Sequence, residues 1–261
     1  MKRLVVVVMI CCFLVDCRKR NYRIDLEIDP IDRWKEVIKD YKEQFNEVLD
    51  EVVKSNQNPI LETVMEYMVD YFALPNLPKD YQDELRGIAL VSGRRLDEVL
   101  LFNIIYDLTS SHFLPKYGDK EDVSVIAGGQ NNTIFHGTNL INMFSPKSQQ
   151  HILTIEFYQN KNLLFKSNHI PGFIGTITAY KPNHFSISLN LKKEGNDVDN
   201  LLSLTSGNFH SIPLTIRKVF EVANSFERAI LFLSNTNFIA PSFVTIGGIN
   251  STQGAIITRF V

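Results

Sequence analysis

The residues best suited to nucleophilic or disulfide chemistry in this 261-residue chain are its three cysteines, Cys11, Cys12 and Cys17. A thiolate attacks carbonyl carbons, and two suitably placed thiols form a disulfide bond. No cysteine follows Cys17, so residues 18–261 hold no thiol and can form no disulfide among themselves. Thiol chemistry is therefore excluded from the body of the chain.

Other patterns that could carry chemistry are weak. The histidines lack the spacing typical of metal ligands; they are His112, His136, His151, His169, His184 and His210. The chain has neither the Gly-x-Ser-x-Gly turn of α/β-hydrolases nor a phosphate-binding glycine loop. We therefore expect no metal and no cofactor.

The N-terminus has the pattern of a targeting segment. Two basic residues precede an unbroken apolar run, Leu4–Val15, and a basic cluster follows Cys17. A short positive region before about 12 apolar residues is typical of a secretory signal peptide and is short for a membrane span. We expect residues 1–17 to be a signal peptide rather than a buried strand, with cleavage before or after Cys17. Cys11 and Cys12 would be removed with it.

Two N-x-[ST] sequons agree with export. They begin at Asn131 and Asn250, which become candidate glycosylation sites if the chain enters the secretory pathway. Such short patterns also arise by chance, so they add only modest support.

Composition excludes some partners. A net charge of −2 and a pI near 6.3 give no electrostatic basis for binding nucleic acid. After the N-terminal run, no segment is long and apolar enough to cross a membrane. About 240 residues after the signal can build one large domain or two small ones. The sequence does not indicate the oligomeric state.

Helical spacing dominates the first part of the mature chain. Asp29 reads as an N-cap with Pro30 at the first helical position, and apolar residues then recur at helical spacing over residues 31–52. Three further helices are predicted, over Glu62–Phe72, Asp80–Val91 and Leu96–Leu108. Residues 18–109 are therefore expected to form a helical unit.

From Val123 the pattern changes to short runs of β-branched and aromatic residues separated by turn residues. Strands are predicted over residues 123–127, 133–137, 152–157, 162–165, 174–180, 184–191, 243–247 and 255–258, with a helical region over 214–234. The polar stretch 110–121 contains Pro and Gly and is a predicted exposed linker. This order predicts an α+β fold with helices packed on an antiparallel sheet, in which residues 122–261 form the sheet domain.

Several stretches match a known family in the same order along nearly all of the mature chain. They are residues 16–19, 29–34, 84–89, 101–108, 124–127, 136–140, 174–186, 246–248 and 256–259. In these stretches the chain resembles the acid ceramidase / N-acylethanolamine acid amidase family of lysosomal lipid amide hydrolases. The resemblance implies an N-terminal-nucleophile hydrolase, with residues 122–261 as part of an αββα sheet domain.

In such hydrolases the precursor cuts itself just before a cysteine, whose thiol becomes the nucleophile and whose new α-amine becomes the base. Aligned on the family's strand and His-Gly turn, the nucleophile position is Asp122. The arginine and aspartate that help position the family's nucleophile fall on Thr138 and Ile141, and a later glutamate falls on Leu191. Ser124 lies two positions along the same strand and is a substitute nucleophile, set against an ordinary strand hydroxyl.

The resemblance also bears on Cys17. In the family, a cysteine near the mature N-terminus bonds the small chain to the large one, and Cys17 resembles that cysteine. The family pattern continues past Ile256–Arg259, whereas this chain stops at Val261. We therefore expect a C-terminally short relative in which Cys17 is unpaired.

Three functions remain open. We expect an uncleaved, non-catalytic relative of acid ceramidase, secreted or lysosomal, that binds an acyl lipid or a partner. The alternatives are an active lipid amidase that hydrolyses ceramide or an N-acylethanolamine through an unrecognised nucleophile, and a truncated product without function. Losing four catalytic positions disfavours the active amidase. The sequence does not separate the other two.

Overall fold

The computed structural model describes residues 21–54, 73–108, 122–139, 147–192 and 210–260, and the pairs 199–200, 202–203 and 206–207. Several predictions concern residues outside these ranges. They are the signal peptide 1–17 with Cys11, Cys12 and Cys17, the helix over 62–72, the linker 110–121 and Ile141.

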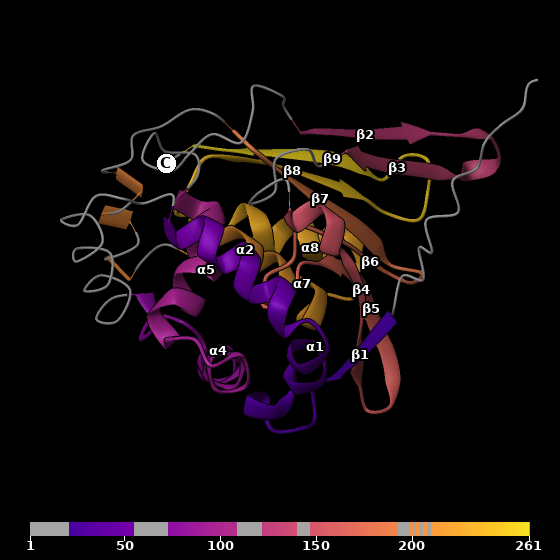
Figure 1. The fold of residues 1–261 in the computed structure, drawn as a ribbon. Coiled ribbons are helices and arrows are strands. Elements are labelled where there is room, and N and C mark those ends of the chain that lie inside the picture. Colours follow the sequence, from indigo (N-terminus) through magenta and orange to yellow (C-terminus); the bar gives the residue numbers. More distant parts are fainter. Residues whose placement is uncertain are drawn as a thin grey trace, which may run out of the picture.

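A sheet of seven strands organises the fold (Figure 1). The strands stand in this order: β1 (Asn21–Asp25), β4 (Leu153–Gln159), β5 (Asn162–His169), β6 (Thr178–Lys181), β7 (Phe185–Leu191), β8 (Ser242–Gly247) and β9 (Gly254–Arg259). Neighbours run antiparallel except β1, which pairs in parallel with β4. Alternation makes one face apolar, as in β4, where Leu153, Ile155 and Phe157 are buried.

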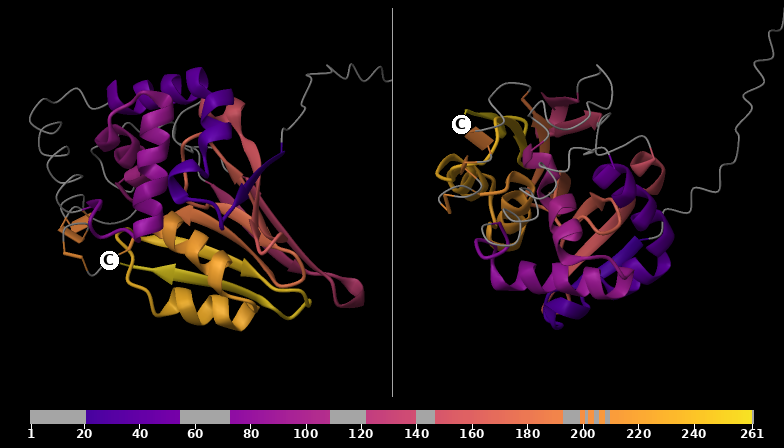
Figure 2. Two further views of the ribbon diagram at one scale, coloured as in Figure 1. Left: turned by 90° about the horizontal axis from the view of Figure 1, so that it is seen from below. Right: turned by 60° about the vertical axis from the view of Figure 1, so that its left-hand side comes forward.

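Helices cover this apolar face. They are η1 (Pro30–Asp32), α1 (Lys35–Asp40), α2 (Lys42–Lys54), α4 (Lys79–Ser92), α5 (Leu96–Leu108), α7 (Ile212–Val222) and α8 (Phe226–Ser234). The predicted N-cap is confirmed, because Asp29 Oδ1 accepts the N–H of Ile31 at 3.2 Å and Pro30 follows at the first position. Figure 2 shows the N-terminal helices, indigo to magenta, beside the C-terminal helices and strands, orange to yellow.

A separate hairpin lies on the other face of the sheet. Its antiparallel strands, β2 (Val123–Gly128) and β3 (Ile134–Asn139), lie over β7, β8 and β9 (Figure 1). The outward side chains of Val123, Val125 and Phe135 are more than half exposed, at 53%, 58% and 64%. Helices, sheet and hairpin thus form three successive layers, which is part of the expected αββα arrangement, and the fold is α+β as predicted.

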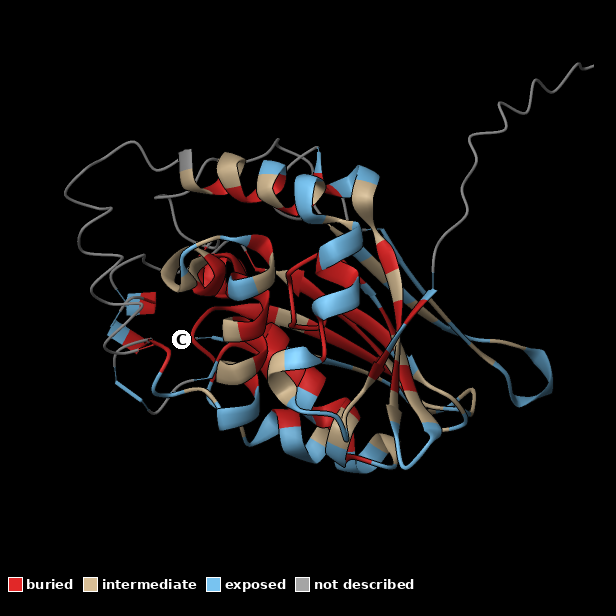
Figure 3. Cartoon of the chain, turned by 60° about the horizontal axis from the view of Figure 1, so that its bottom comes forward, coloured by how far each residue is buried: buried red, intermediate tan, exposed pale blue. Residues whose placement is uncertain are grey.

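The hydrophobic core fills the space between the helices and the sheet, as the buried side of each element shows in Figure 3. Phe157 of β4 stacks on Phe165 of β5 with 4.3 Å between ring centroids, and Phe165 stacks on Phe220 of α7 at 5.1 Å. Aromatic pairs of this kind add about 0.5–1.5 kcal/mol each beyond the area they bury. These rings therefore join α7 to the sheet.

A buried carboxylate, Glu84 on α4, joins the helices to one another. Its Oε1 accepts from Arg33 Nη1 at 2.9 Å and from Arg217 Nη2 at 2.6 Å. Its Oε2 accepts from Trp34 Nε1 at 2.7 Å and from Arg217 Nη1 at 2.5 Å. Burial alone would raise the pKa of Glu84, but the charge of Arg217 and these hydrogen bonds outweigh it and lower the pKa. Glu84 is therefore ionised and fully paired.

Two other buried groups have opposite pKa shifts. Asp107, near the end of α5, accepts the N–H of Ile212 at 2.8 Å, and burial raises its pKa to about 7 despite this hydrogen bond. His169, at the end of β5, has Nδ1 2.9 Å from the carbonyl oxygen of Phe173, and burial lowers its pKa to about 4. Asp107 therefore stabilises the fold towards acidic pH, and His169 stabilises it towards neutral pH.

The predicted strands and helices are largely confirmed, with ends shifted by a few residues. One prediction was wrong at the N-terminus, where residues 21–25 were assigned to the helical unit. They form β1, because Tyr22 and Ile24 alternate inward against the sheet edge at β4. The sheet is consequently mixed rather than wholly antiparallel.

Three predicted segments also differ in extent. The strand over 174–180 begins only at Thr178, because Asn103 of α5 holds the preceding turn through the N–H of Ile174 at 2.7 Å. The helix over 31–52 breaks at Tyr41, and the helix over 214–234 breaks before Ser225, whose side chain caps α8.

Replacing Glu84 tests its role. Glu84→Gln removes the negative charge between Arg33 and Arg217 while keeping the side-chain size. Breaking a buried ion pair leaves an uncompensated buried charge. We therefore expect the free energy of unfolding, measured in urea, to fall by about 3–5 kcal/mol.

Asp83→Asn on the adjacent position is the matched control, since Asp83 pairs with Lys79 and Arg86 near the surface. We expect Asp83→Asn to change the free energy of unfolding by no more than about 1 kcal/mol. Equal losses in the two variants would contradict the role given to Glu84.

Replacing Asp107 tests its pKa. A carboxyl group whose pKa is raised on folding stabilises the folded state fully below its unfolded value, and this contribution is lost as pH rises through the folded value. Asp107→Asn keeps an acceptor for Ile212 but cannot ionise. Relative to the native chain, we expect the free energy of unfolding of the variant to gain about 3 kcal/mol between pH 4 and pH 7. Urea unfolding across this range measures the difference, and a difference independent of pH would refute the shifted pKa.

Candidate functional site

Asp122, the predicted nucleophile position, lies where β2 begins, beside the end of α5. Asp122 directly precedes β2 and is partly buried. Burial raises the pKa of Tyr106 well above its usual range, and the charges of Asp122 and Asp107 raise it further. The carboxylate at the family's nucleophile position therefore lies close to the C-terminal end of α5.

Ser124 occupies the centre of a hydrogen-bonded cluster between the hairpin and the sheet. Its Oγ lies 2.5 Å from Asn190 Oδ1 on β7 and 3.1 Å from Thr138 Oγ1 on β3, to both of which it can donate. It accepts from Ser188 Oγ, also on β7, at 2.7 Å. Ser124 is therefore held by side-chain hydrogen bonds to both β3 and β7.

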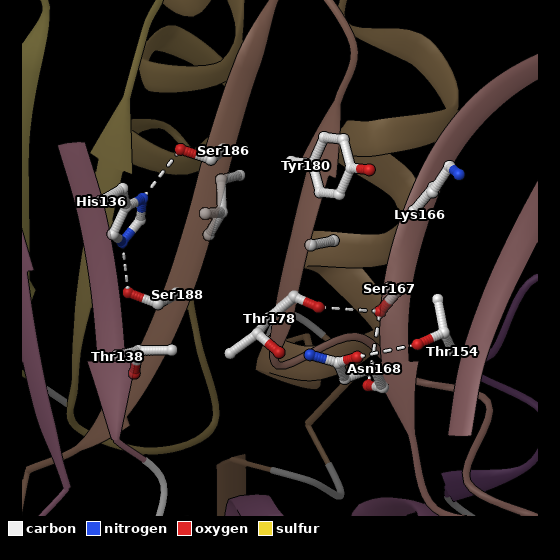
Figure 4. A pocket seen from close by; sticks show the side chains of 12 residues that line it. His136, Thr138, Thr154, Lys166, Ser167, Asn168, Thr178, Tyr180, Ser186 and Ser188 are labelled. Carbon is white, nitrogen blue, oxygen red and sulfur yellow. Dashed lines mark hydrogen bonds between the residues drawn. The ribbon is translucent and has the colours of Figure 1, made fainter. Parts of the chain in front are cut away.

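His136 lies between two serines of β7. Its Nδ1 is 2.8 Å from Ser186 Oγ, and its Nε2 is 2.7 Å from Ser188 Oγ. Burial lowers the pKa of His136, which favours the neutral imidazole. Figure 4 shows the ring between these two hydroxyls.

A polar pocket of about 190 Å³ opens beside His136 on the sheet face that the hairpin leaves uncovered (Figure 4). Ser188 and Thr138 line it near His136, and Tyr180 and Lys166 line its far side. Lys166 is paired with Glu156 at 2.6 Å. The pocket is therefore a polar surface hollow next to the serine cluster.

The remaining predicted positions supply no catalytic charge. Thr138 faces Ser124 directly in the β2–β3 ladder, and its hydroxyl donates to the carbonyl oxygen of Val123 at 3.3 Å. Leu191 packs against the hydrophobic core at the end of β7. Neither side chain can carry the charge of the arginine or the glutamate found in the family pattern.

The sequence reasoning missed the partners of His136 and Ser124 on β7. Ser186, Ser188 and Asn190 alternate along β7, so their side chains share the face that meets the hairpin. This alternation was visible in the sequence, but the strand that covers it could not be deduced from spacing alone.

The two sequons lie on neighbouring turns. Asn131 is exposed in the β2–β3 turn with φ of 55°, and Asn132 follows at 58°. Asn132 Nδ2 donates to Asn250 Oδ1 at 3.1 Å, and Asn132 Oδ1 accepts from Ser251 Oγ at 3.0 Å. The two turns are therefore held together by side chains within the sequons, and glycosylation stays a prediction.

Two findings on the described residues concern metal binding and membrane spanning. Across the described ranges, no three His, Cys, Asp or Glu side chains gather as a metal site requires. None of the helices in those ranges combines the length and the apolar character of a membrane span.

Comparison with known proteins gives consistent matches. A family model described as the beta subunit of N-acylethanolamine-hydrolyzing acid amidase matches residues 20–73. The N-acylethanolamine-hydrolyzing acid amidase of Caenorhabditis elegans is 27% identical over 255 residues, which cover 96% of this chain and 70% of the relative. The acid ceramidase of Heterocephalus glaber is 30% identical over 270 residues, which cover 94% of this chain and 68% of the relative.

A solved structure of the Caenorhabditis elegans N-acylethanolamine-hydrolyzing acid amidase ortholog superposes with a TM-score of 0.48 at 25% identity. The superposition covers 52% of this chain and 59% of that chain. The assignment therefore rests on the sequence matches.

The layers of helices, sheet and hairpin make this an α+β protein with part of the αββα arrangement. Within that fold class, the chain belongs to the acid ceramidase / N-acylethanolamine acid amidase family.

Proposed function

We propose that this chain keeps the family scaffold, lacks the family's cysteine-dependent amide hydrolysis, and acts by binding an acyl lipid. The observation that carries the proposal is the aspartate at the nucleophile position, Asp122. An N-terminal nucleophile is exposed when a cysteine, serine or threonine side chain attacks the preceding peptide bond, and a carboxylate does not readily do this.

The surroundings of Asp122 support the same conclusion. The family's arginine position holds Thr138, which is neutral and bonded to Ser124. The position of its glutamate holds Leu191, which packs against the core. Restoring a thiol at residue 122 alone would therefore not rebuild the charges that activate it.

An apolar cavity supports a binding role. It measures about 240 Å³, lies between α4, α5, α7 and α8, and is lined mainly by apolar side chains, among them Leu77, Ile104, Leu214, Phe232 and Ile239. A preformed apolar hollow with few polar groups is the usual form of a small-molecule site. The relatives are named for ceramide and N-acylethanolamine, both of which carry an acyl chain, so this chain is the part the cavity would take.

We also propose entry into the secretory pathway, with residues 1–17 as signal peptide and glycans on Asn131 and Asn250. The mature chain would comprise a helical unit over 18–109, a linker over 110–121 and the hydrolase-like part over 122–261. Exposure of Asn131 on its turn supports glycan attachment. Secreted protein that shows no mobility shift on removal of N-glycans would refute the glycans.

Acidification of the full chain tests the absence of self-cleavage. Because Asp122 cannot generate an N-terminal nucleophile, we expect one band on a denaturing gel and no fatty acid release from ceramide or an N-acylethanolamine. Asp122→Cys should behave in the same way, since Thr138 and Leu191 are unchanged. Two fragments from the native chain, with a new N-terminus near residue 122 and amide hydrolysis, would overturn the proposal.

Native mass spectrometry tests the binding role. We expect a bound fatty acid or N-acyl lipid, and Phe232→Asp should remove it by placing a charge in the apolar cavity. Leu231→Asp is the matched control, because Leu231 is 63% exposed and lies outside this cavity. Loss of the lipid in both variants, or in neither, would count against the cavity as the site.

A further inference from the structure

Three serines and one histidine form a continuous hydrogen-bonded chain beside the substituted catalytic positions. Ser186, His136, Ser188 and Ser124 follow one another at 2.8, 2.7 and 2.7 Å. Ser124 continues the chain to Asn190 Oδ1 at 2.5 Å. The residues come from β2, β3 and β7, so only the folded chain assembles them.

We propose that Ser124 is a nucleophile for acyl transfer from small, activated carboxylic esters, with His136 as the base and Ser188 carrying the proton between them. The inference goes beyond the proposed function, because it depends neither on the side chain of Asp122 nor on lipid in the apolar cavity.

The surroundings of His136 orient its ring for this role. Nδ1 lies 2.8 Å from Ser186 Oγ, which in turn lies 3.4 Å from the carbonyl oxygen of Gly247. When Nδ1–H donates to Ser186 and Ser186 donates to Gly247, the lone pair of Nε2 faces Ser188. Hydroxyl protons rotate freely enough for Ser124 then to donate to Ser188, and Ser188 to His136.

Exposure suits the roles of the two serines. Ser188 is 1% exposed, so the hydroxyl that carries the proton is shielded from water. Ser124 is partly exposed, and the polar pocket lined by His136, Ser188 and Thr138 opens beside it. A small ester can therefore approach Ser124, while His136 lines the same pocket and is joined to Ser124 through Ser188.

The reaction balances within these groups. Ser124 Oγ attacks the ester carbonyl carbon while its proton passes to Ser188, and the proton of Ser188 passes to His136 Nε2. Collapse of the tetrahedral intermediate breaks the bond to the alcohol oxygen, which takes the proton back through Ser188. Water then attacks the acyl–Ser124 ester, giving up a proton by the same route, and the acid leaves as Ser124 regains its hydrogen.

A buried amide group lies next to Ser124. Asn190 is 6% exposed, and within the described residues its Nδ2 has no hydrogen-bond partner. Its Oδ1 is already in contact with Ser124, so Nδ2 of the same amide group is close to the reacting oxygen.

The partners of His136 also set the class of substrate. Both ring nitrogens contact neutral serines, whereas serine hydrolases usually hold the imidazolium with a carboxylate. Removing that carboxylate charge lowers turnover by roughly 10⁴-fold. A slow reaction with good leaving groups is therefore expected, and amide hydrolysis is not.

A fluorophosphonate probe and p-nitrophenyl acetate test the site in the full chain. We expect the probe on the Ser124 peptide, ester hydrolysis above background, and loss of both in Ser124→Ala. Ser188→Ala and His136→Gln should each slow labelling by about 10²-fold or more. Ser188→Thr keeps the hydroxyl and should restore labelling, which a purely structural role would not require.

Ser234→Ala, at an exposed serine at the end of α8 outside the pocket, is the control and should label at the native rate. Ser124→Cys provides a second readout that preserves packing: iodoacetamide should modify its thiol, and adding His136→Gln should slow that reaction. Labelling at another serine, no labelling of the folded chain, or a rate insensitive to His136 would overturn the proposal. Amide hydrolysis and chain cleavage are measured separately, so each proposal fails on its own result.

Discussion

One buried carboxylate, Glu84, fixes how the helical layer sits on the sheet. It bonds Arg33 and Trp34 ahead of α1 and Arg217 on α7, which are far apart in sequence. Arg217 reaches further, donating to the carbonyl oxygen of Ile174 at 3.2 Å in the segment before β6. Since a buried charge without partners is costly, the helices cannot shift independently of one another. The end of α5 is joined to α7 separately, because Asp107 accepts the N–H of Ile212 at 2.8 Å.

Above the sheet, the organising interactions are polar rather than apolar. Along β7, Phe185, Ile187 and Leu189 face the helices, while alternate residues turn serine and asparagine side chains to the hairpin. Two packed sheets usually interdigitate apolar side chains. Here imidazole and hydroxyl groups fill much of that interface. The layer between hairpin and sheet therefore owes its order to hydrogen bonds among His136, Ser188 and Ser124.

The sequence predicted the elements whose signals are local. The alternation in residues 123–128 and 185–191 identifies β2 and β7, and the Asp29 cap marks the start of the helical part. Strand β1 was missed because five residues acquire strand geometry only by pairing with β4, far along the chain. At the site, aligned spacing singled out Asp122, Ser124 and Thr138, whose catalytic roles stay predictions. The contacts of His136 were not foreseen, because β3 and β7 belong to separate sheets and no local pattern reports how sheets pack.

The opposite pKa shifts of Asp107 and His169 have a joint consequence. Between about pH 4 and pH 6.5, unfolding releases the proton that burial keeps on Asp107. Over the same interval, unfolding binds a proton to the newly exposed imidazole of His169. One proton leaves as another arrives, so these two groups together make unfolding nearly proton-neutral. Acidification from about pH 6.5 to pH 4 therefore changes the free energy of unfolding little through these two groups, because the gain from one offsets the loss from the other.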